Sequence, residues 1–274
     1  MNTPLISIIT PCFNHGIYLE EMIDSIQINK YDNVFEHIIV NDGSTDVYTV
    51  DQLKICEERG IKVIHQKNIG LAHARNAGIA ISNGKYILPL DADNKIFPEV
   101  FIKAAAIMND DNLIDVLYTD AEYFGEKTGI WEVGDFHGIK IIADNYIDAC
   151  SLIRKDVFGT FGLYDINMPA MGHEDWELWV RLYLNSRKFY YLNEIGYSYR
   201  VRSNAMTVTT TRPNIENNRA YIYSKYAKSI STILSKLKML EIDQVGKLVQ
   251  FKDRVKNNRF KEAMKLIIGK DLFL

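Results

Sequence analysis

Long apolar runs are missing from this sequence, and none approaches the roughly 20 residues that a helix needs to span a bilayer. Cysteine is scarce, and the three present (Cys12, Cys56 and Cys150) are too widely spaced for a disulfide framework or a zinc site. The N-terminus lacks a basic stretch followed by an apolar core, so no secretory signal is expected. These absences favour a protein of the reducing cytoplasm.

Two nucleotide-binding signatures are also absent. The sequence contains neither the dinucleotide fingerprint G-x-G-x-x-G nor the P-loop pattern G-x-x-x-x-G-K-[ST]. A nicotinamide-dependent dehydrogenase and a P-loop NTPase are therefore disfavoured, and no feature indicates a nucleic-acid partner.

What is present is an ordinary globular composition with an uneven charge. The 274 residues are 47% hydrophobic and 24% charged, which suits one large domain or a domain with an appendage. Residues 214–274 hold 13 Lys/Arg against 6 Asp/Glu, whereas residues 1–213 hold 19 against 29. The basic C-terminal segment predicts either peripheral contact with the inner face of a membrane or docking on the acidic body, and the sequence leaves both open.

The hydrophobic pattern predicts an α/β fold. Four apolar, β-rich runs alternate with helical patterns in the first half of the chain: Leu5–Ile9, Glu36–Val40, Ile61–His65 and Tyr86–Leu90. Such alternation is typical of right-handed βαβ units in a mainly parallel sheet flanked by helices. Further elements are expected at 97–108 and 173–182 (helices), 115–120, 188–192 and 197–202 (strands) and 121–134 (a hairpin). The domain expectation is a catalytic domain at 1–213 and a basic helical extension at 214–274.

Two acids directly follow the fourth run. Asp91 and Asp93 are one residue apart, so in extended backbone their side chains share a face. Ligands of open α/β sheets bind at the carboxyl ends of the strands. Hard oxygen ligands suit Mg²⁺ or Mn²⁺, which can carry a phosphate. The alternative is a solvated turn.

Three further charged residues occupy helix positions with two possible roles. Arg75 lies in a helical pattern after Gly70, where it forms either a surface salt bridge or a pair with a phosphate or carboxylate. Glu174 and Asp175 lie in the first turn of an amphipathic helix. There they either compensate the helix dipole or hold a carboxylate where it can take a proton from a hydroxyl.

Taken together, five motifs between residue 5 and about 206 resemble the inverting family 2 glycosyltransferases of bacterial type, which have the GT-A fold. The motifs are Thr10-Pro11-Cys12-Phe13-Asn14, Asn41-Asp42-Gly43-Ser44-Thr45-Asp46, Asn68-x-Gly70-Leu71-Ala72-x-Ala74-Arg75-Asn76, Asp91-Ala92-Asp93 and Glu174-Asp175. Each is weak alone, but each lies at a predicted strand end or helix start, in order. The resemblance implies a Rossmann-like catalytic domain and a nucleotide-sugar donor.

The resemblance also implies a nucleotide site. Its residues would be Pro11, Asp42, Asn68, Gly70, Arg75 and Asp91. Pro11 and Asp42 would hold the base, with Asp42 accepting from a ring N–H. Arg75 would lie near the base or the diphosphate, and Asp91 would bind the ribose or a metal-bound water.

For the metal, the resemblance implies Mn²⁺ or Mg²⁺ on Asp93. Arg200 and Arg202 would help to neutralise the diphosphate. Some relatives have a metal-binding His where this chain has Arg202, which leaves Asp93 as the one protein ligand that the resemblance supports.

For the acceptor, the resemblance implies Asp175 as the general base, with Glu174 and Trp176 seating the acceptor sugar. A metal on the leaving diphosphate makes a protein acid unnecessary, so one base suffices and the anomeric carbon inverts. The expected function is transfer from a nucleotide sugar, with UDP favoured, to a saccharide or lipid-linked saccharide of a surface polysaccharide or glycoconjugate. The alternatives are a sugar nucleotidyltransferase, whose early Gly-rich signature residues 10–20 lack, and a non-catalytic nucleotide-sugar-binding protein.

Overall fold

The structure is a computed structural model that describes residues 4–31, 33–203, 211–236, 238–239, 247 and 250. The chain separates into two compact units, Met1–Lys225 and Tyr226–Leu274. The helix Arg212–Lys225, with which the basic segment begins, belongs to the larger unit. The division into a catalytic domain at 1–213 and an extension at 214–274 stays a prediction. In the second unit, residues 227–236 are helical. Residues 237, 240–246, 248–249 and 251–274 of the expected helical extension lie outside the described residues.

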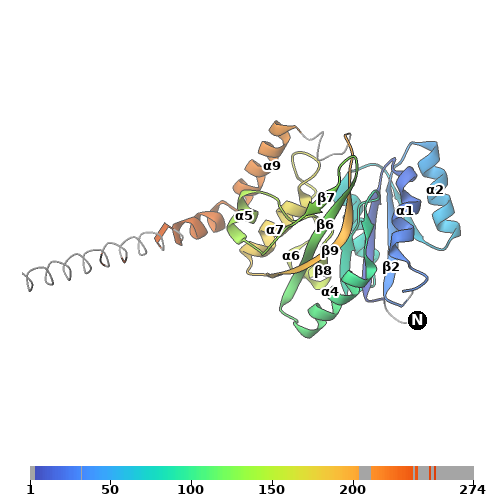
Figure 1. Cartoon of the computed structure of the whole chain (residues 1–274). Coiled ribbons are helices and arrows are strands. Elements are labelled where there is room, and N and C mark those ends of the chain that lie inside the picture. Colours follow the sequence, from blue (N-terminus) through green and yellow to red (C-terminus); the bar gives the residue numbers. More distant parts are fainter. Residues whose placement is uncertain are drawn as a thin grey trace, which may run out of the picture. The chain divides into compact units, whose positions relative to one another are not determined.

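The larger unit alternates strands and helices (Figure 1). In chain order its elements are β1 (Ile6–Cys12), α1 (Gly16–Ile26), β2 (Phe35–Asp42), α2 (Val47–Glu58), β3 (Lys62–Gln66), α3 (Leu71–Ile81), β4 (Tyr86–Pro89), β5 (Lys95–Ile96), α4 (Pro98–Asp110), β6 (Ile114–Gly125), β7 (Gly129–Trp131), α5 (Gly138–Ala143), β8 (Leu152–Arg154), α6 (Asp156–Phe161), α7 (Glu174–Leu184), β9 (Lys188–Val201) and α9 (Arg212–Lys225). Among the described residues, no helix is both long enough and apolar enough to cross a membrane.

The strands form one mixed sheet in the order β3-β2-β1-β4-β8-β6-β9-β5, with β7 paired to β6. The first four strands of this order are parallel, as the βαβ pattern predicts. Strand β8 enters antiparallel between β4 and β6 and joins this half to the C-terminal half. The carboxyl ends of β1, β2 and β4 therefore meet at one edge of the sheet.

One expectation about the strands is wrong. Residues 188–192 and 197–202 were expected as separate strands, but they form the single strand β9. Strand β9 runs parallel to β6, and its register shifts around Thr119–Ala121, opposite the polar stretch that begins at Asn193. Residues of β9 that interrupt the alternation of apolar and polar side chains are left unpaired at this bulge, so the strand continues past them.

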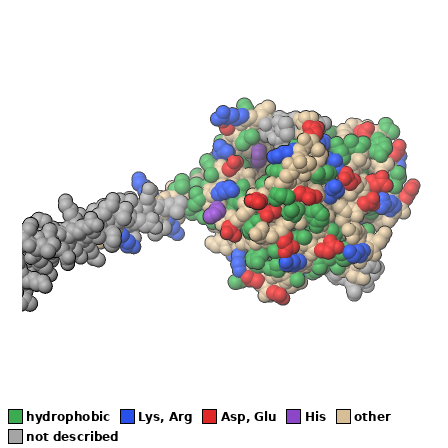
Figure 2. Space-filling view, in the orientation of Figure 1, with side chains coloured by type: hydrophobic (Ala, Val, Ile, Leu, Met, Phe, Trp, Pro, Cys, Tyr) green, Lys and Arg blue, Asp and Glu red, His purple; other side chains and the backbone are tan. Residues whose placement is uncertain are grey.

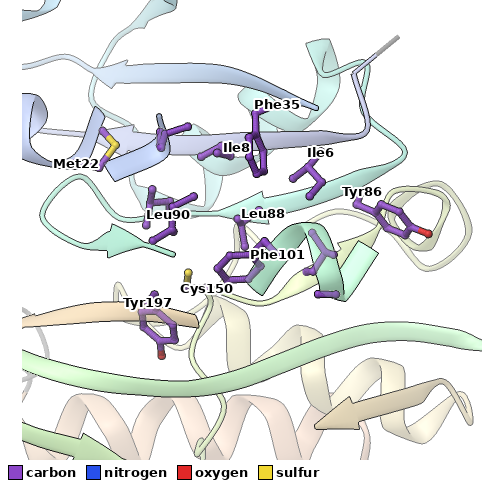
Figure 3. Packing of buried hydrophobic residues seen from close by; sticks show 14 of the residues in the cluster. Ile6, Ile8, Met22, Phe35, Tyr86, Leu88, Leu90, Phe101, Cys150 and Tyr197 are labelled. Atoms are coloured by element: carbon purple, nitrogen blue, oxygen red, sulfur yellow. The ribbon is translucent and has the colours of Figure 1, made fainter. Parts of the chain in front are cut away.

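A continuous apolar core covers one face of the sheet. Ile8, Leu88 and Phe101 are fully buried and pack together across β1, β4 and α4 (Figure 3). Helices α1 and α2 pack against each other on the β2 side, and α5 packs on α7 (Figure 1). On the face shown in Figure 2, Lys and Arg side chains of this unit lie among Asp and Glu side chains rather than in a patch of one sign.

Candidate active site

The loop that leaves β4 presents the two predicted acids in different surroundings. The Asp91 side chain is 37% exposed, whereas that of Asp93 is 12% exposed. The loop is closed by a hydrogen bond from the Asn94 amide to the Asp91 carbonyl, 3.0 Å long. Asp91 is thus open to a ligand, while Asp93 is largely enclosed.

Arg75 connects this loop to the predicted acceptor helix. Its Nη2 donates to Asp91 Oδ1 at 2.8 Å, and its Nη1 donates to Glu174 Oε1 on α7. The Arg75 side chain is 3% exposed. Burial works against its charge, but Asp91 and Glu174 outweigh that cost and raise the pKa of Arg75. Two segments far apart in sequence are therefore held by one cation.

The two adjacent acids of α7 have different partners. Glu174 is buried against Arg75, and burial raises its pKa while Arg75 opposes that rise. Asp175 accepts from Asn145 Nδ2 at 3.0 Å and from the Trp176 amide at 2.8 Å, both neutral donors. Trp176 is fully buried, and its indole N–H donates to the Ile141 carbonyl. The predicted acceptor contacts of Glu174 and Trp176 stay predictions.

The end of β9 holds Asp93. Arg202 Nη2 lies 2.7 Å from Asp93 Oδ2 and 3.4 Å from His15 Nε2. Arg200 donates from Nε to the Asp93 carbonyl and from its amide to Asn94 Oδ1, each at 2.9 Å. Burial and then the nearby Asp91 raise the pKa of Asp93, while Arg202 and His15 oppose the rise. The guanidinium of Arg202 thus places a positive charge beside the carboxylate of Asp93.

That ion pair tests whether the site fits a divalent cation. Asp93 offers a hard carboxylate ligand at a position that holds a cation, so the residues fit a metal that takes its other ligands from a diphosphate and water. In the described part of the chain, no three His, Cys, Asp or Glu side chains converge into a complete ligand set. The protein by itself therefore offers a partial site.

On the nucleotide side, Asp42 ends β2 and ties down the loop before α3. Its carboxylate accepts from Gln66 Nε2 (2.7 Å), from the Ile69 amide (3.0 Å) and from the Gly70 amide (2.9 Å). Gly70 has φ 102°, a conformation that a side chain disfavours. These bonds fix the entry to α3 and so the position of Arg75.

The other two nucleotide-side predictions lie nearby. Pro11 is buried in β1 in register with Val40 of β2, and Asn68 is exposed in the loop before α3. The structure therefore brings the predicted donor residues to one edge of the sheet. Their individual contacts with a nucleotide stay predictions.

Asp148 was missed by the sequence reasoning. It precedes β8, and its Oδ1 accepts from the Cys150 amide at 2.8 Å. Burial, followed by the charge of Asp91, raises the pKa of Asp148 to about 7, with Asp175 adding to the rise. Perturbed acids gather at functional sites, but the only local signal was a charge just before the buried run 149–153.

Comparison with known proteins places the chain in a family. Residues 7–165 match the model described as glycosyl transferase family 2. The chain belongs to this family. It is therefore a glycosyltransferase, as the motifs predicted, and the two alternative functions are set aside.

Similar proteins include glycosyltransferases from several bacteria. An uncharacterized glycosyltransferase of Rickettsia typhi is 27% identical over 250 residues, which cover 84% of this chain and 73% of that protein. Glycosyltransferase GlyA of Streptococcus pneumoniae is 30% identical over 224 residues, which cover 74% of this chain but 31% of GlyA. Several relatives are thus much longer than the shared part.

Solved structures of S. aureus TarS have a similar fold. TarS itself gives a TM-score of 0.64 at 20% identity, covering 82% of this chain and 40% of TarS. Its residues 1–349 in complex with UDP-GlcNAc give 0.60 at 20% identity, covering 76% of this chain and 61% of that one. This likeness confirms the predicted GT-A fold of the glycosyltransferase and shows the fold alone.

Proposed function

We propose that this glycosyltransferase moves a sugar from a UDP-sugar to a hydroxyl of a saccharide or lipid-linked saccharide, with inversion and with Mn²⁺ or Mg²⁺ as cofactor. The observation that carries the proposal is the double pairing of Arg75. Its guanidinium contacts Asp91 on the predicted donor side and Glu174 on the predicted acceptor side. If these roles hold, donor and acceptor would meet within the span of one side chain, as direct displacement requires.

The surroundings of α7 favour Asp175 as the base. Glu174 is committed to a buried ion pair, so taking a proton would remove one of the two carboxylates that pair with the buried Arg75. Asp175 accepts only from neutral N–H groups in the described contacts, and it is less buried than Glu174. A carboxylate that is fixed by neutral donors can accept a proton from an acceptor hydroxyl.

The Asn145 amide would keep Asp175 in place during the reaction. Its Nδ2 donates to Oδ2 of Asp175, while the backbone N–H of Trp176 holds Oδ1. Two donors on different atoms fix the plane of the carboxylate. A fixed plane leaves the remaining lone pairs aimed at one position.

Asp93 would hold the divalent cation, which when bound supplies positive charge against the departing diphosphate. Arg202 forms an ion pair with Asp93 in the structure, so this pair would have to break before a cation could bind the carboxylate. The diphosphate of the donor offers Arg202 an alternative anion, and Arg200 lies beside the same loop. The two arginines would thus neutralise the diphosphate when the donor binds.

The choice of UDP rests on similarity, since a TarS segment was solved in complex with UDP-GlcNAc. The choice of acceptor rests on the resemblance of the motifs. Neither choice follows from the contacts within this chain.

The proposal is tested with UDP-GlcNAc as donor and water as acceptor. We expect release of UDP in the presence of Mn²⁺, a fall of about 10²- to 10⁴-fold in kcat for Asp175→Asn, and unchanged UDP affinity in that variant. Asp175→Asn is a matched change because it keeps the size of the side chain. Hydrolysis at the wild-type rate by Asp175→Asn would remove it as the base.

A further inference from the structure

The turn that leads into α7 has an unusual backbone. Gly172 has φ 88°, and His173, the residue before the helix, has φ 69° and ψ 14°. Left-handed backbone is natural for glycine but unfavourable for histidine. His173 makes no side-chain cap to the helix. Some other contact has to hold this turn, because it sets the direction in which Glu174 and Asp175 leave it.

That contact comes from α9. Asn218 Nδ2 lies 3.1 Å from the Ala170 carbonyl, 3.0 Å from the Gly172 carbonyl and 3.1 Å from His173 Nδ1. Its Oδ1 accepts from the Ala170 amide at 2.9 Å. Asn218 is fully buried. One side chain thus engages both ends of the turn.

Helix α9 is itself anchored along the same face. Ile222 is fully buried one turn after Asn218, and Tyr221 donates to Asp165 at 2.8 Å. Lys225 pairs with Asp165 at 2.5 Å and with Glu177 of α7 at 2.8 Å. Positions 218, 221, 222 and 225 follow helical spacing, so they share one face. The helix therefore presents Asn218 from a fixed base.

We infer that Asn218 is a positioning residue for the glycosyl transfer, holding the 170–173 turn so that α7 aims Asp175 at the acceptor hydroxyl. This rests on the proposed role of Asp175. Helix α9 lies beyond the residues 7–165 matched by the family model, so membership of the family assigns it no role. The described hydrogen bonds of Asn218 go to the 170–173 turn, so its direct effect is on the start of α7.

The test uses the full chain, UDP-GlcNAc hydrolysis with Mn²⁺, and UDP binding by calorimetry. We expect Asn218→Ala to lower kcat about tenfold to a hundredfold, since a small displacement of a catalytic group has that effect, with KM and UDP affinity unchanged. Tyr221→Phe is the matched control, because it removes a contact of α9 without touching the turn. It should keep wild-type kcat.

A rescue variant tests whether Asn218 acts by positioning the 170–173 turn or only by packing α9 against the rest of the unit. In Asn218→Ala/His173→Gly, glycine adopts the left-handed conformation without strain, so kcat should rise above that of Asn218→Ala. Equal kcat for Asn218→Ala and wild type, an equal loss in Tyr221→Phe, or no gain in the double variant would overturn the inference.

Hydrogen exchange over residues 170–176 gives a readout independent of turnover. Exchange there should be faster in Asn218→Ala than in Tyr221→Phe, and equal rates would refute the inference even if the wild type released no UDP. Absence of UDP release by the wild type, or full activity of Asp175→Asn, would instead count against the proposed function. The two failures are therefore distinguishable.

Discussion

Replacing Arg202 by Ala should tighten Mn²⁺ binding by the nucleotide-free protein. Arg202 and the metal compete for the same carboxylate, since Nη2 of Arg202 lies 2.7 Å from Oδ2 of Asp93. The two side chains are 15% and 12% exposed, so solvent screens the pair little. A hydrogen bond to a charged group contributes about 1.5–3 kcal/mol, and each 1.4 kcal/mol is a factor of ten. The expected gain in Mn²⁺ affinity is about 10- to 100-fold.

The same substitution should act in the opposite direction on the nucleotide. If Arg202 transfers to the diphosphate, its loss removes a charge-assisted contact and should weaken UDP binding by about tenfold. Both affinities are measured by calorimetry at one pH, with Mn²⁺ alone and then with UDP. Arg59→Ala is the control, because Arg59 pairs with Asp24 at the surface, and it should change neither affinity.

The opposite signs make the reasoning refutable. Unchanged Mn²⁺ affinity in Arg202→Ala would mean that the pair with Asp93 does not oppose the metal. Tighter Mn²⁺ binding with unchanged UDP affinity would keep the competition but refute the transfer of Arg202 to the diphosphate. Asp93→Asn should lose Mn²⁺ affinity whatever residue stands at 202.

Two further predictions concern stability, both measured by urea unfolding. Gly16→Ala should lower the free energy of unfolding by about 1–3 kcal/mol, because the added Cβ would lie 2.4 Å from Thr49 Cα. Gly159→Ala is the matched control: its Cβ would have no atom within 4 Å, so the free energy of unfolding should stay the same or rise by up to about 1 kcal/mol. Burial favours the neutral form of Asp165, but Lys225 and nearby hydrogen bonds outweigh it and lower the pKa of Asp165 to about 2. The charged form of Asp165 therefore stabilises the folded protein above the unfolded pKa near 3.8, and this stabilisation is lost as the pH falls through about 2. Lys225→Met should therefore destabilise by about 1 kcal/mol at neutral pH, with the difference shrinking below pH 4; a constant difference would contradict this.

The sequence predicted the parts of the site that depend on local signals. Asp91 directly follows an apolar run and Asp42 follows one after a single Asn, and a strand that ends in an acid is visible in a short window. Glu174 and Asp175 begin a strongly amphipathic helix, whose start is likewise visible locally. Because ligands of such sheets bind at the carboxyl ends of parallel strands, these acids could be predicted to lie at one edge of the sheet.

The contacts between these parts were not predictable from spacing. Arg75 was left with two roles because its partner Glu174 lies 99 residues away. Asn218 stands in a polar stretch, Asn-Ile-Glu-Asn-Asn-Arg, that gives no sign of burial. Its burial depends on where the 170–173 turn lies, which only the packed chain defines. Asp148 was missed for the same reason, since its neighbours come from other elements.

The adjacency of Glu174 and Asp175 makes the proposed site depend on a fixed turn. Consecutive residues of a helix point in different directions, so one turn of α7 aims Glu174 at Arg75 and leaves Asp175 beside Asn145. Arg75 in turn contacts Asp91. A rotation of α7 about its axis would both break the buried ion pair between Glu174 and Arg75 and displace Asp175. The buried ion pair therefore contributes orientation more than stability, because desolvation offsets most of its Coulomb attraction.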